Sequence, residues 1–208
     1  MTKRTYSSRV RAVAAGRTHT AILRAAEELF VVRGYTRTTL SAIAERAGVA
    51  LNTVYTSVGG KPALVDALAR EGTEDEGIGT SLTALLASTD CGEILRLTAE
   101  ATGMTTRRHE RVLNFLRDNA ASNPAVATAA EHAVERYHER LTLIAEHLVT
   151  LRETRPDAVR TEQILWFHFG QESWRTVRGF GWTWEDCATW LASRAADALL
   201  SPSVGRDD

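Results

Sequence analysis

The stretch TLSAIAERAGVALNTVYTSVGGK, residues 39–61, has the pattern of two short helices joined by a tight turn. Thr39 can cap a first helix through its hydroxyl, and Gly48 can adopt the left-handed conformation in which that helix ends. A second helix over about residues 51–57 would bury Val54 and expose the side chains of its opposite face. This layout is typical of a helix-turn-helix, whose second helix enters the major groove of DNA. We therefore expect this stretch to bind DNA.

The charge distribution agrees with a DNA partner for the first part of the chain. Residues 1–61 contain ten Lys or Arg and three Asp or Glu, a net charge of +7, whereas the remaining residues contain 15 and 23, a net charge of −8. A cationic segment is attracted to the phosphate backbone, and an acidic one is repelled from it. Charge asymmetry alone is equally well explained by solvation, so its weight comes from its coincidence with the helix-turn-helix.

Composition and periodicity predict an all-α chain of about nine helices in two domains. Residues 1–16 are basic and rich in small residues, which predicts a flexible arm. Residues 17–70 are expected to form a three-helix helix-turn-helix DNA-binding domain, together with a fourth helix that opens at Lys61. The acidic, glycine-rich segment GTEDEGIG at residues 72–79 marks the boundary with a larger helical domain over residues 71–208.

The helices of the larger domain follow from their apolar spacing. The clearest pattern covers residues 124–154, where apolar residues recur at intervals of three and four. Further helices are expected at about residues 80–87, 92–102, 106–120, 157–178 and 183–200. All five tryptophans lie in the last two of these helices or in their connection. Such a pair of helices, rich in aromatic and small residues, favours a helix-on-helix interface between two copies of the chain.

At this point the chain resembles the TetR/AcrR family of transcriptional regulators. The resemblance covers about residues 17–68. It is carried, in order and at the family's spacing, by Gly34, Tyr35, Thr38, Thr39, Ile43, Ala44, Gly48, Val49, Thr53, Tyr55, Gly60 and Lys61. In that family the second domain forms a dimer through its last two helices and encloses a small-molecule pocket. The resemblance implies a repressor that binds a pseudo-palindromic DNA operator as a homodimer and is released by a small apolar or aromatic effector.

The resemblance also assigns DNA-binding roles by position. Thr39 corresponds to a threonine that caps the second helix and binds phosphate, and Tyr55 and Lys61 correspond to phosphate contacts. The expected DNA-binding residues are Arg17, Thr39, Ser41, Leu51, Asn52, Thr53, Tyr55, Thr56, Ser57 and Lys61.

The chain departs from the family pattern at two of these positions, Asn52 and Ser57, and at the neighbouring Val58. The family usually has a small residue in place of Asn52, an aromatic residue or histidine in place of Ser57, and a bulky aromatic in place of Val58. Leu51, Thr56 and Ser57 offer little bidentate hydrogen bonding to bases. We therefore expect phosphate contacts, DNA shape and the arginines of the arm to carry much of the affinity.

Two further residue sets are expected in the larger domain. The aromatic and polar side chains suited to line an effector pocket are Asn114, Phe115, Tyr137, Trp166, His168, Phe169 and Trp174. The residues expected at the dimer interface are Phe167, Trp190, Leu191, Arg194, Ala195, Ala198 and Leu199. For any single pocket residue an ordinary place in the core is the simpler explanation, so the prediction rests on the set as a whole.

Several function classes are disfavoured by what the sequence lacks. No apolar run approaches the roughly 18 residues of a membrane span, and the two cysteines have neither metal-ligand spacing nor a disulfide pattern. No phosphate-binding loop, nucleophile elbow or HExxH motif is present. We expect a cytoplasmic protein without enzymatic activity, cofactor, metal or membrane partner.

Two other classes remain open. One is a DNA-binding regulator without a ligand, and the other is an all-helical small-molecule carrier whose basic first third is incidental. The sequence does not separate an activator from a repressor, because the difference depends on where the operator lies.

Overall fold

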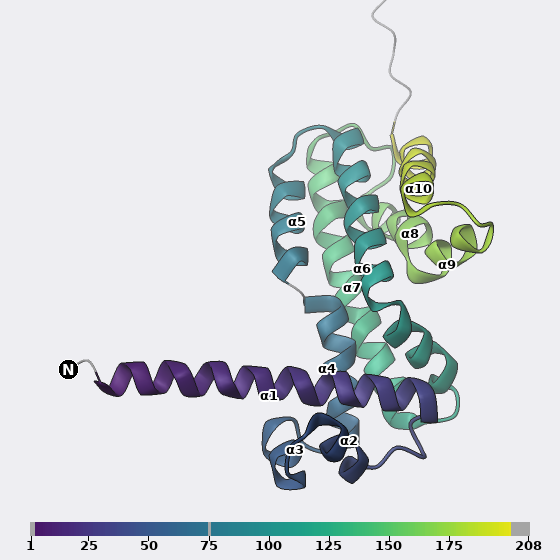
Figure 1. The fold of residues 1–208 in the computed structure, drawn as a ribbon. Helices are drawn as coiled ribbons and strands as arrows, with labels where there is room; N and C mark the ends of the chain where they lie inside the picture. Colours follow the sequence, from purple (N-terminus) through teal and green to yellow (C-terminus); the bar gives the residue numbers. More distant parts are fainter. Residues whose placement is uncertain (1–2, 75, 201–208) are drawn as a thin grey trace, which may run out of the picture. The chain divides into compact units, whose positions relative to one another are not determined.

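The computed structural model describes residues 3–74 and 76–200, and side chains for residues 12–71 and 79–200. The described residues form helices and no β-strand, which confirms the all-α prediction (Figure 1). None of the described helices is long and apolar enough to cross a membrane. The helices are α1 (Lys3–Arg33), α2 (Leu40–Ala47), α3 (Leu51–Ser57), α4 (Lys61–Glu74), α5 (Glu76–Ala87), α6 (Cys91–Ala120), α7 (Pro124–Thr150), α8 (Ala158–Phe169), α9 (Gln171–Gly179) and α10 (Trp184–Leu199).

The helices form two compact units, each with its own buried core. Unit 1 consists of Met1–Gly72 and Arg111–Ala133, and unit 2 consists of Thr73–Glu110 and Val134–Asp208. The chain therefore passes between the units three times, once near the end of α4 and once within each of the long helices α6 and α7.

The helical segments at 111–133 differ from the expected division, which placed residues 71–208 in the second domain. Val112 and Phe115 are buried in the same core as the apolar face of α1. The ring of Phe115 stacks on Phe30 with a centroid distance of 5.6 Å. The apolar stripes of α6 and α7 were visible in the sequence, but the partner that covers each part of a stripe is set by the tertiary fold.

The helix-turn-helix has the local geometry that its sequence predicts. The Thr39 side chain accepts a hydrogen bond from the backbone N–H of Ala42 and caps α2. Gly48 ends α2 with φ +68°, a left-handed conformation in which a side chain would be strained. Ile43 of α2 and Val54 of α3 are fully buried, so each short helix has one apolar anchor in the core of unit 1.

Residues 3–16 form the first turns of α1 instead of the expected flexible arm. Ala12, Ala14 and Ala15 have high helix propensity, and a helical glycine such as Gly16 costs only about 1 kcal/mol relative to alanine. The segment is continuous with the part of α1 that is buried from Ile22 onward. Because helix propagation is easier than nucleation, this anchored part extends into the exposed turns.

Helix boundaries in unit 2 differ from the expectation at two places. The helix expected over residues 157–178 is divided into α8 and α9, because Gly170 is extended (φ −62°, ψ 158°) and a Cβ there would lie 2.6 Å from the carbonyl oxygen of Trp166. Conversely, the helices expected at 92–102 and 106–120 are joined into α6. His109 interrupts α6 with non-helical dihedral angles (φ −108°, ψ 15°).

The core of unit 2 includes a close approach between Gly103 of α6 and the fully buried Trp174 of α9. A Cβ at position 103 would lie 2.6 Å from Cη2 of the indole. We expect Gly103→Ala to lower the free energy of unfolding by about 1–3 kcal/mol, because the ring or the helix has to move. Urea unfolding followed by circular dichroism measures this change.

Gly179→Ala is the matched control, since no atom lies within 4 Å of a Cβ at this position and α9 ends there. Its free energy of unfolding should stay within about 0.5 kcal/mol of the unchanged chain. Equal effects of the two substitutions would contradict the tight contact at Trp174.

Candidate DNA-binding surface and ligand cavity

Helix α3 exposes one continuous face. Leu51, Asn52, Tyr55 and Thr56 are exposed; Asn52 and Thr56 lie opposite the buried Val54, and Leu51 and Tyr55 lie beside them on one flank. The turn before α3 is fixed by backbone hydrogen bonds, among them one of 3.0 Å from the N–H of Val49 to the carbonyl of Ala44. The face is therefore presented on a rigid support, as reading of DNA bases requires.

The ten predicted DNA-binding residues fall into two groups. Those that are exposed are Arg17, Thr39, Ser41, Leu51, Asn52, Tyr55 and Thr56. Those that are half-buried are Thr53, Ser57 and Lys61. The Thr39 hydroxyl, which accepts the capping hydrogen bond, can at the same time donate its proton to a phosphate oxygen.

The hydroxyls at the end of α3 have partners within unit 1. Thr56 Oγ1 donates to the carbonyl oxygens of Asn52 (3.0 Å) and Thr53 (3.2 Å). Ser57 Oγ lies 3.4 Å from Nδ1 of His19 on α1. This contact draws Ser57 toward α1, and sequence reasoning missed His19 because 38 residues separate the two. The exposed face of α3 therefore consists of its first two residues together with Tyr55 and Thr56.

Lys61 is held by the loop between α1 and α2. Its Nζ donates to the carbonyl oxygens of Tyr35 (2.6 Å) and Thr36 (3.4 Å), and it lies 4.2 Å from the centroid of the Tyr35 ring. Burial lowers the pKa of this amine from its ordinary value. Lys61 therefore has a structural role besides its expected role as a phosphate contact: its ammonium group links the start of α4 to a loop 26 residues earlier.

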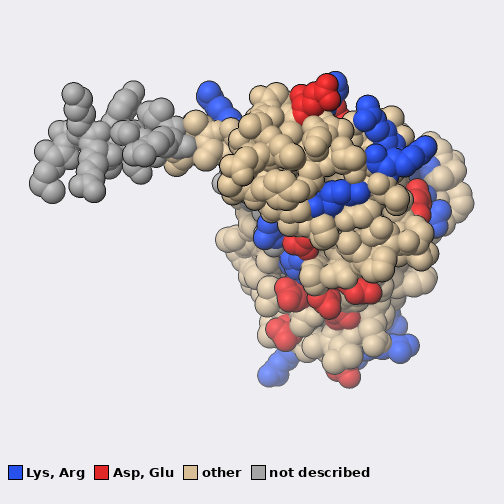
Figure 2. Space-filling view, turned by 90° about the horizontal axis from the view of Figure 1, so that it is seen from below, with Lys and Arg blue, Asp and Glu red and all other residues tan. Residues whose placement is uncertain are grey.

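The basic residues of unit 1 whose side chains are described lie apart from one another. Figure 2 shows the face that carries α2 and α3: uncharged atoms cover most of it, and Lys and Arg atoms lie at separate places. Arg46 Nη2 forms an ion pair of 2.5 Å with Glu28, and Arg37 Nε donates to the carbonyl of Arg33. The Lys and Arg side chains that the structure describes on this face therefore lie around a largely uncharged centre.

Unit 2 contains a cavity of about 80 Å³ between α5, α6 and α7. It is lined by Ser81, Leu82, Leu85, Thr98, Ala101, Thr102, Met104, Thr105, Arg108, His109, Tyr137, Arg140, Leu141 and Ile144. Of the seven residues predicted to line a pocket, Tyr137 alone belongs to this set.

The other predicted pocket residues lie elsewhere. Asn114 and Phe115 belong to unit 1, and Phe169 and Trp174 are fully buried in the core of unit 2. The remaining two are half-buried on α8: Trp166 stacks on His138 at a centroid distance of 4.2 Å, and His168 lies beside Phe167 at 5.1 Å. None of these six residues lines the cavity, and the rings of Phe115, Phe169 and Trp174 instead fill space in the two cores.

The cavity instead lies where side chains are short. Thr98, Ala101, Thr102 and Thr105 recur along α6 at intervals of three and four, so they share the face that lines it. This stripe of small residues was the sequence signal that could have located the cavity.

Two hydrogen bonds connect the cavity wall to the corner between α8 and α9. Tyr137 Oη donates to the carbonyl of Phe169 (2.8 Å), and Trp174 Nε1 donates to Thr102 Oγ1 (3.3 Å). Burial raises the pKa of the Tyr137 phenol well above its ordinary value, so the phenol stays protonated and remains a donor. The two bonds hold residues on either side of Gly170, where the chain turns from α8 into α9.

The predicted dimer residues separate into exposed and buried sets. Leu191, Ala195 and Leu199 are buried in the core of unit 2 and cannot contact a partner, so the prediction was wrong for them. Helical spacing could not separate the face of α10 that packs within the chain from the face that points outward. The four residues that are exposed are Phe167, Trp190, Arg194 and Ala198.

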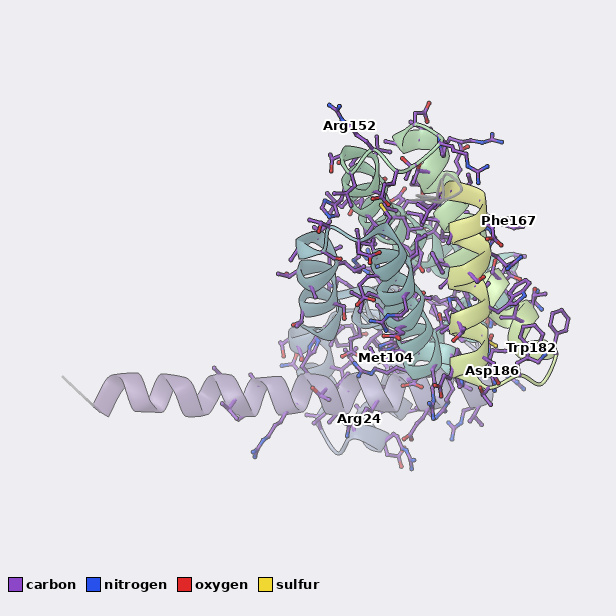
Figure 3. All side chains as sticks on the ribbon, turned by 90° about the horizontal axis from the view of Figure 1, so that it is seen from above. Arg24, Met104, Arg152, Phe167, Trp182 and Asp186 are labelled. Atoms are coloured by element: carbon purple, nitrogen blue, oxygen red, sulfur yellow. The ribbon has the colours of Figure 1, made fainter. Side chains whose placement is uncertain are left out.

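Exposed rings extend this surface beyond the predicted set. The ring of Trp182 lies 5.7 Å from Phe180 and 5.7 Å from Trp190, measured between centroids. Phe167 is 72% exposed and Phe180 is 62% exposed. Figure 3 shows Phe167 and Trp182 on the same side of unit 2 as α10, pointing outward. We call Phe167, Phe180, Trp182 and Trp190 the aromatic surface; rings exposed to water in this way make it a candidate interaction site.

Comparison with known proteins agrees with this architecture. Residues 22–68 match the sequence model of the family described as bacterial regulatory proteins, tetR family. This segment runs from the buried part of α1 to the middle of α4 and includes the whole helix-turn-helix. No curated protein sequence is similar enough to the chain to be matched.

Solved structures share the fold of the chain. NalD, the secondary repressor of the MexAB-OprM multidrug efflux pump in Pseudomonas aeruginosa, is 24% identical with a TM-score of 0.70, over 94% of this chain and 99% of that chain. FadR from Bacillus subtilis, a transcriptional regulator solved with stearoyl-CoA, is 15% identical with a TM-score of 0.69, over 86% and 98%. GusR from Salmonella enterica is 20% identical with a TM-score of 0.66, over 88% and 95%.

The structural role of Lys61 predicts a loss of stability that a phosphate contact alone would not cause. Lys61→Met should lower the free energy of unfolding by about 1.5–3 kcal/mol, because the Tyr35 carbonyl loses a charged donor. Arg17→Met removes the same charge from an exposed site and should change it by less than about 0.5 kcal/mol. Chemical denaturation without DNA compares them, and a Lys61 variant as stable as the Arg17 variant would refute the structural role.

Proposed function

From the tetR-family helix-turn-helix domain of this chain, a domain of DNA-binding regulators and not of enzymes, we propose a ligand-responsive transcriptional repressor. It acts in the cytoplasm, binds a pseudo-palindromic DNA operator as a homodimer, and leaves the operator when a small molecule occupies unit 2. The observation that carries this proposal is the exposed face of α3, in a helix-turn-helix whose first helix is capped by Thr39 and whose two helices are anchored in the core by Ile43 and Val54.

The chemistry of that face suits the major groove. The Asn52 amide can form a bidentate pair with the N6 and N7 atoms of adenine, and Leu51 can contact a thymine methyl group. The Tyr55 phenol and the Thr39 hydroxyl can bind phosphate oxygens, which fixes the position of α3 on the duplex. Asn52, which departs from the family pattern, is thus the strongest candidate for base recognition.

The aromatic surface supports the homodimer. Two copies that bury Phe167, Phe180, Trp182 and Trp190 against each other remove these rings from water, which favours association. A two-fold dimer presents two α3 helices to half-sites about 34 Å apart, one turn of DNA.

The cavity supports the response to a ligand. A molecule that contacts Tyr137 and Thr102 acts on the two side chains that hold the corner between α8 and α9. It also contacts His109, where α6 departs from helical geometry one residue before the end of its unit 2 part. A ligand that prefers one arrangement of these elements shifts the population toward that arrangement. FadR from Bacillus subtilis, solved with stearoyl-CoA, gives a precedent for a regulator of this fold that binds a small molecule.

Selection of bound fragments from a random DNA pool at physiological salt tests the DNA-binding part of this proposal. We expect enrichment of a two-fold symmetric motif, since each copy of the dimer reads one half-site. Binding that depends on salt without any enriched motif would reject sequence recognition and would favour the carrier alternative.

Two variants of α3 separate base contacts from phosphate contacts. Asn52→Ala should cost about 1–3 kcal/mol on the selected motif and relax the preference at one base pair of each half-site. Tyr55→Phe should weaken binding to all sequences by a similar factor, because phosphate contacts carry no sequence information. Fluorescence anisotropy with matched and mutated duplexes measures both, and a uniform loss for Asn52→Ala would reject its role as a base reader.

The corner between α8 and α9 gives a separate prediction. Tyr137→Phe removes the hydrogen bond to the Phe169 carbonyl and should lower the free energy of unfolding by about 1 kcal/mol. Tyr55→Phe is the control for stability, because Tyr55 is exposed and should show little change. Thermal and urea unfolding test this pair, and equal stabilities would show that the bond does not hold the corner.

A further inference from the structure

The threonine hydroxyls in the wall of the unit 2 cavity donate their protons to partners within the chain. Thr98 Oγ1 donates to the carbonyl of Ile94 (2.7 Å), and Thr105 Oγ1 donates to the carbonyl of Ala101 (2.9 Å). A carbonyl oxygen can only accept, so the partner fixes the direction of each bond. Because a hydroxyl has one proton and two lone pairs, both threonine oxygens keep only the capacity to accept.

Thr102 and Tyr137 in the same wall are engaged in the same way. Thr102 Oγ1 donates to the carbonyl of Thr98 (2.8 Å) and accepts from Nε1 of Trp174 (3.3 Å). Tyr137 Oη donates to the carbonyl of Phe169 (2.8 Å), and burial raises the pKa of this phenol, so the proton stays in that bond. These two hydroxyls therefore have no proton left for a ligand either.

The threonine oxygens form a row along one face of α6. Thr98 and Thr105 lie two helical turns apart with Thr102 between them, and all three line the cavity. Trp174 already donates to Thr102, whereas none of the described hydrogen bonds is donated to Oγ1 of Thr98 or Thr105. Thr98 and Thr105 are therefore the acceptors that the wall offers to a ligand.

The charged residues of the lining have interactions of their own. Arg108, His109 and Arg140 each take part in further contacts within the chain, so no ligand contact is assigned to them. The lining that the structure describes contains no Asp or Glu, so a buried cation would find no carboxylate there to pair with. A carboxylate, in turn, would bring further lone pairs against the threonine oxygens. The ligand that fits this row is uncharged and has a hydrogen-bond donor.

The rest of the ligand has to be small and apolar. The cavity has a volume of about 80 Å³, compared with the roughly 150 Å³ of an apolar cavity that binds benzene. Its lining includes aliphatic side chains, among them Leu85 of α5 and Ile144 of α7. The occupant therefore has a body of a few carbon atoms, and the donor adds to the apolar character that the sequence predicts for the effector.

We propose that the cavity of unit 2 binds a short uncharged alcohol, whose hydroxyl donates to Thr98 or Thr105 and whose carbon atoms contact Leu85 and Ile144. This inference rests on the proposed function in taking the cavity as the effector site, and it adds the chemical class of the effector.

NMR chemical-shift titration of the full chain tests the class with probes of similar carbon skeleton. We expect sec-butanol to bind at least about five-fold more tightly than butanone, because the ketone oxygen loses water and meets no free donor among these hydroxyls. Both sec-butylammonium and butanoate should bind more weakly than sec-butanol. Equal or tighter binding of butanone, sec-butylammonium or butanoate, or no binding of any probe, would overturn the proposal.

Threonine variants test the position of the donor. Thr98→Val and Thr105→Val each replace a hydroxyl by a methyl group, and the double variant should lose the preference for sec-butanol while its affinity for butanone stays unchanged. Thr142→Val is the matched control, because Thr142 Oγ1 donates to the carbonyl of His138 (3.0 Å) in the same way but is exposed and does not line the cavity.

A preference that survives in the double variant, or that is lost equally in the Thr142 variant, would reject the assignment of the acceptors. The probe comparison uses the unchanged chain, so it decides on the class of ligand even where the double variant fails to fold.

Release of the selected operator fragment, followed by fluorescence anisotropy, separates this inference from the proposed function. If sec-butanol binds the chain and releases the DNA, both are supported. If it binds without releasing DNA, the alcohol site is supported and its role as an effector site is contradicted. Release by butanone or butanoate but not by sec-butanol supports the proposed function and overturns the alcohol inference.

Discussion

Unit 1 depends on the burial of one face of α1. The helices α2 and α3 contain eight and seven residues, which is too short for a stable helix in water. Each becomes stable by placing an apolar residue, Ile43 or Val54, in the core that Ile22 and Phe30 of α1 organise. The caps at Thr39 and Gly48 then set where α2 begins and ends, but they act on a helix that the core already holds. The exposed face of α3 is a consequence of this burial.

The same core involves the long helices α6 and α7. Val112 and Phe115 of α6 pack in unit 1, whereas Thr98 to His109 of the same helix face the cavity of unit 2. Helix α6 therefore contributes both to the core of unit 1 and to the wall of the cavity in unit 2. Its only non-helical residue, His109, lies at the end of the cavity portion. Under the proposed regulatory function, a ligand would act only through states that the cavity and the exposed face of α3 share.

The errors of the sequence-based predictions have a common cause. Periodicity identifies which face of a helix is apolar, but not whether another helix of the chain, a second copy or a cavity covers it. Phe169 and Trp174 were predicted to line a pocket because they are aromatic, yet rings of this volume fill the core and leave no space. Leu191 and Ala195 likewise belong to the face of α10 that packs within the chain. The cavity lies instead along threonines and an alanine, whose short side chains leave a gap.

The sequence by itself determined the helix-turn-helix pattern and its caps, because these are visible in residues a few positions apart. Thr39 and Gly48 set where α2 begins and ends, and Val54 marks the face of α3 that turns inward, although the core with α1 is what stabilises both helices. Only the tertiary structure decided that Lys61 bonds to the Tyr35 carbonyl, and that arginines of α6 and α7 line one cavity. Those contacts join residues 26 or more positions apart, and their formation depends on how whole helices pack and which side chains fill the space between them.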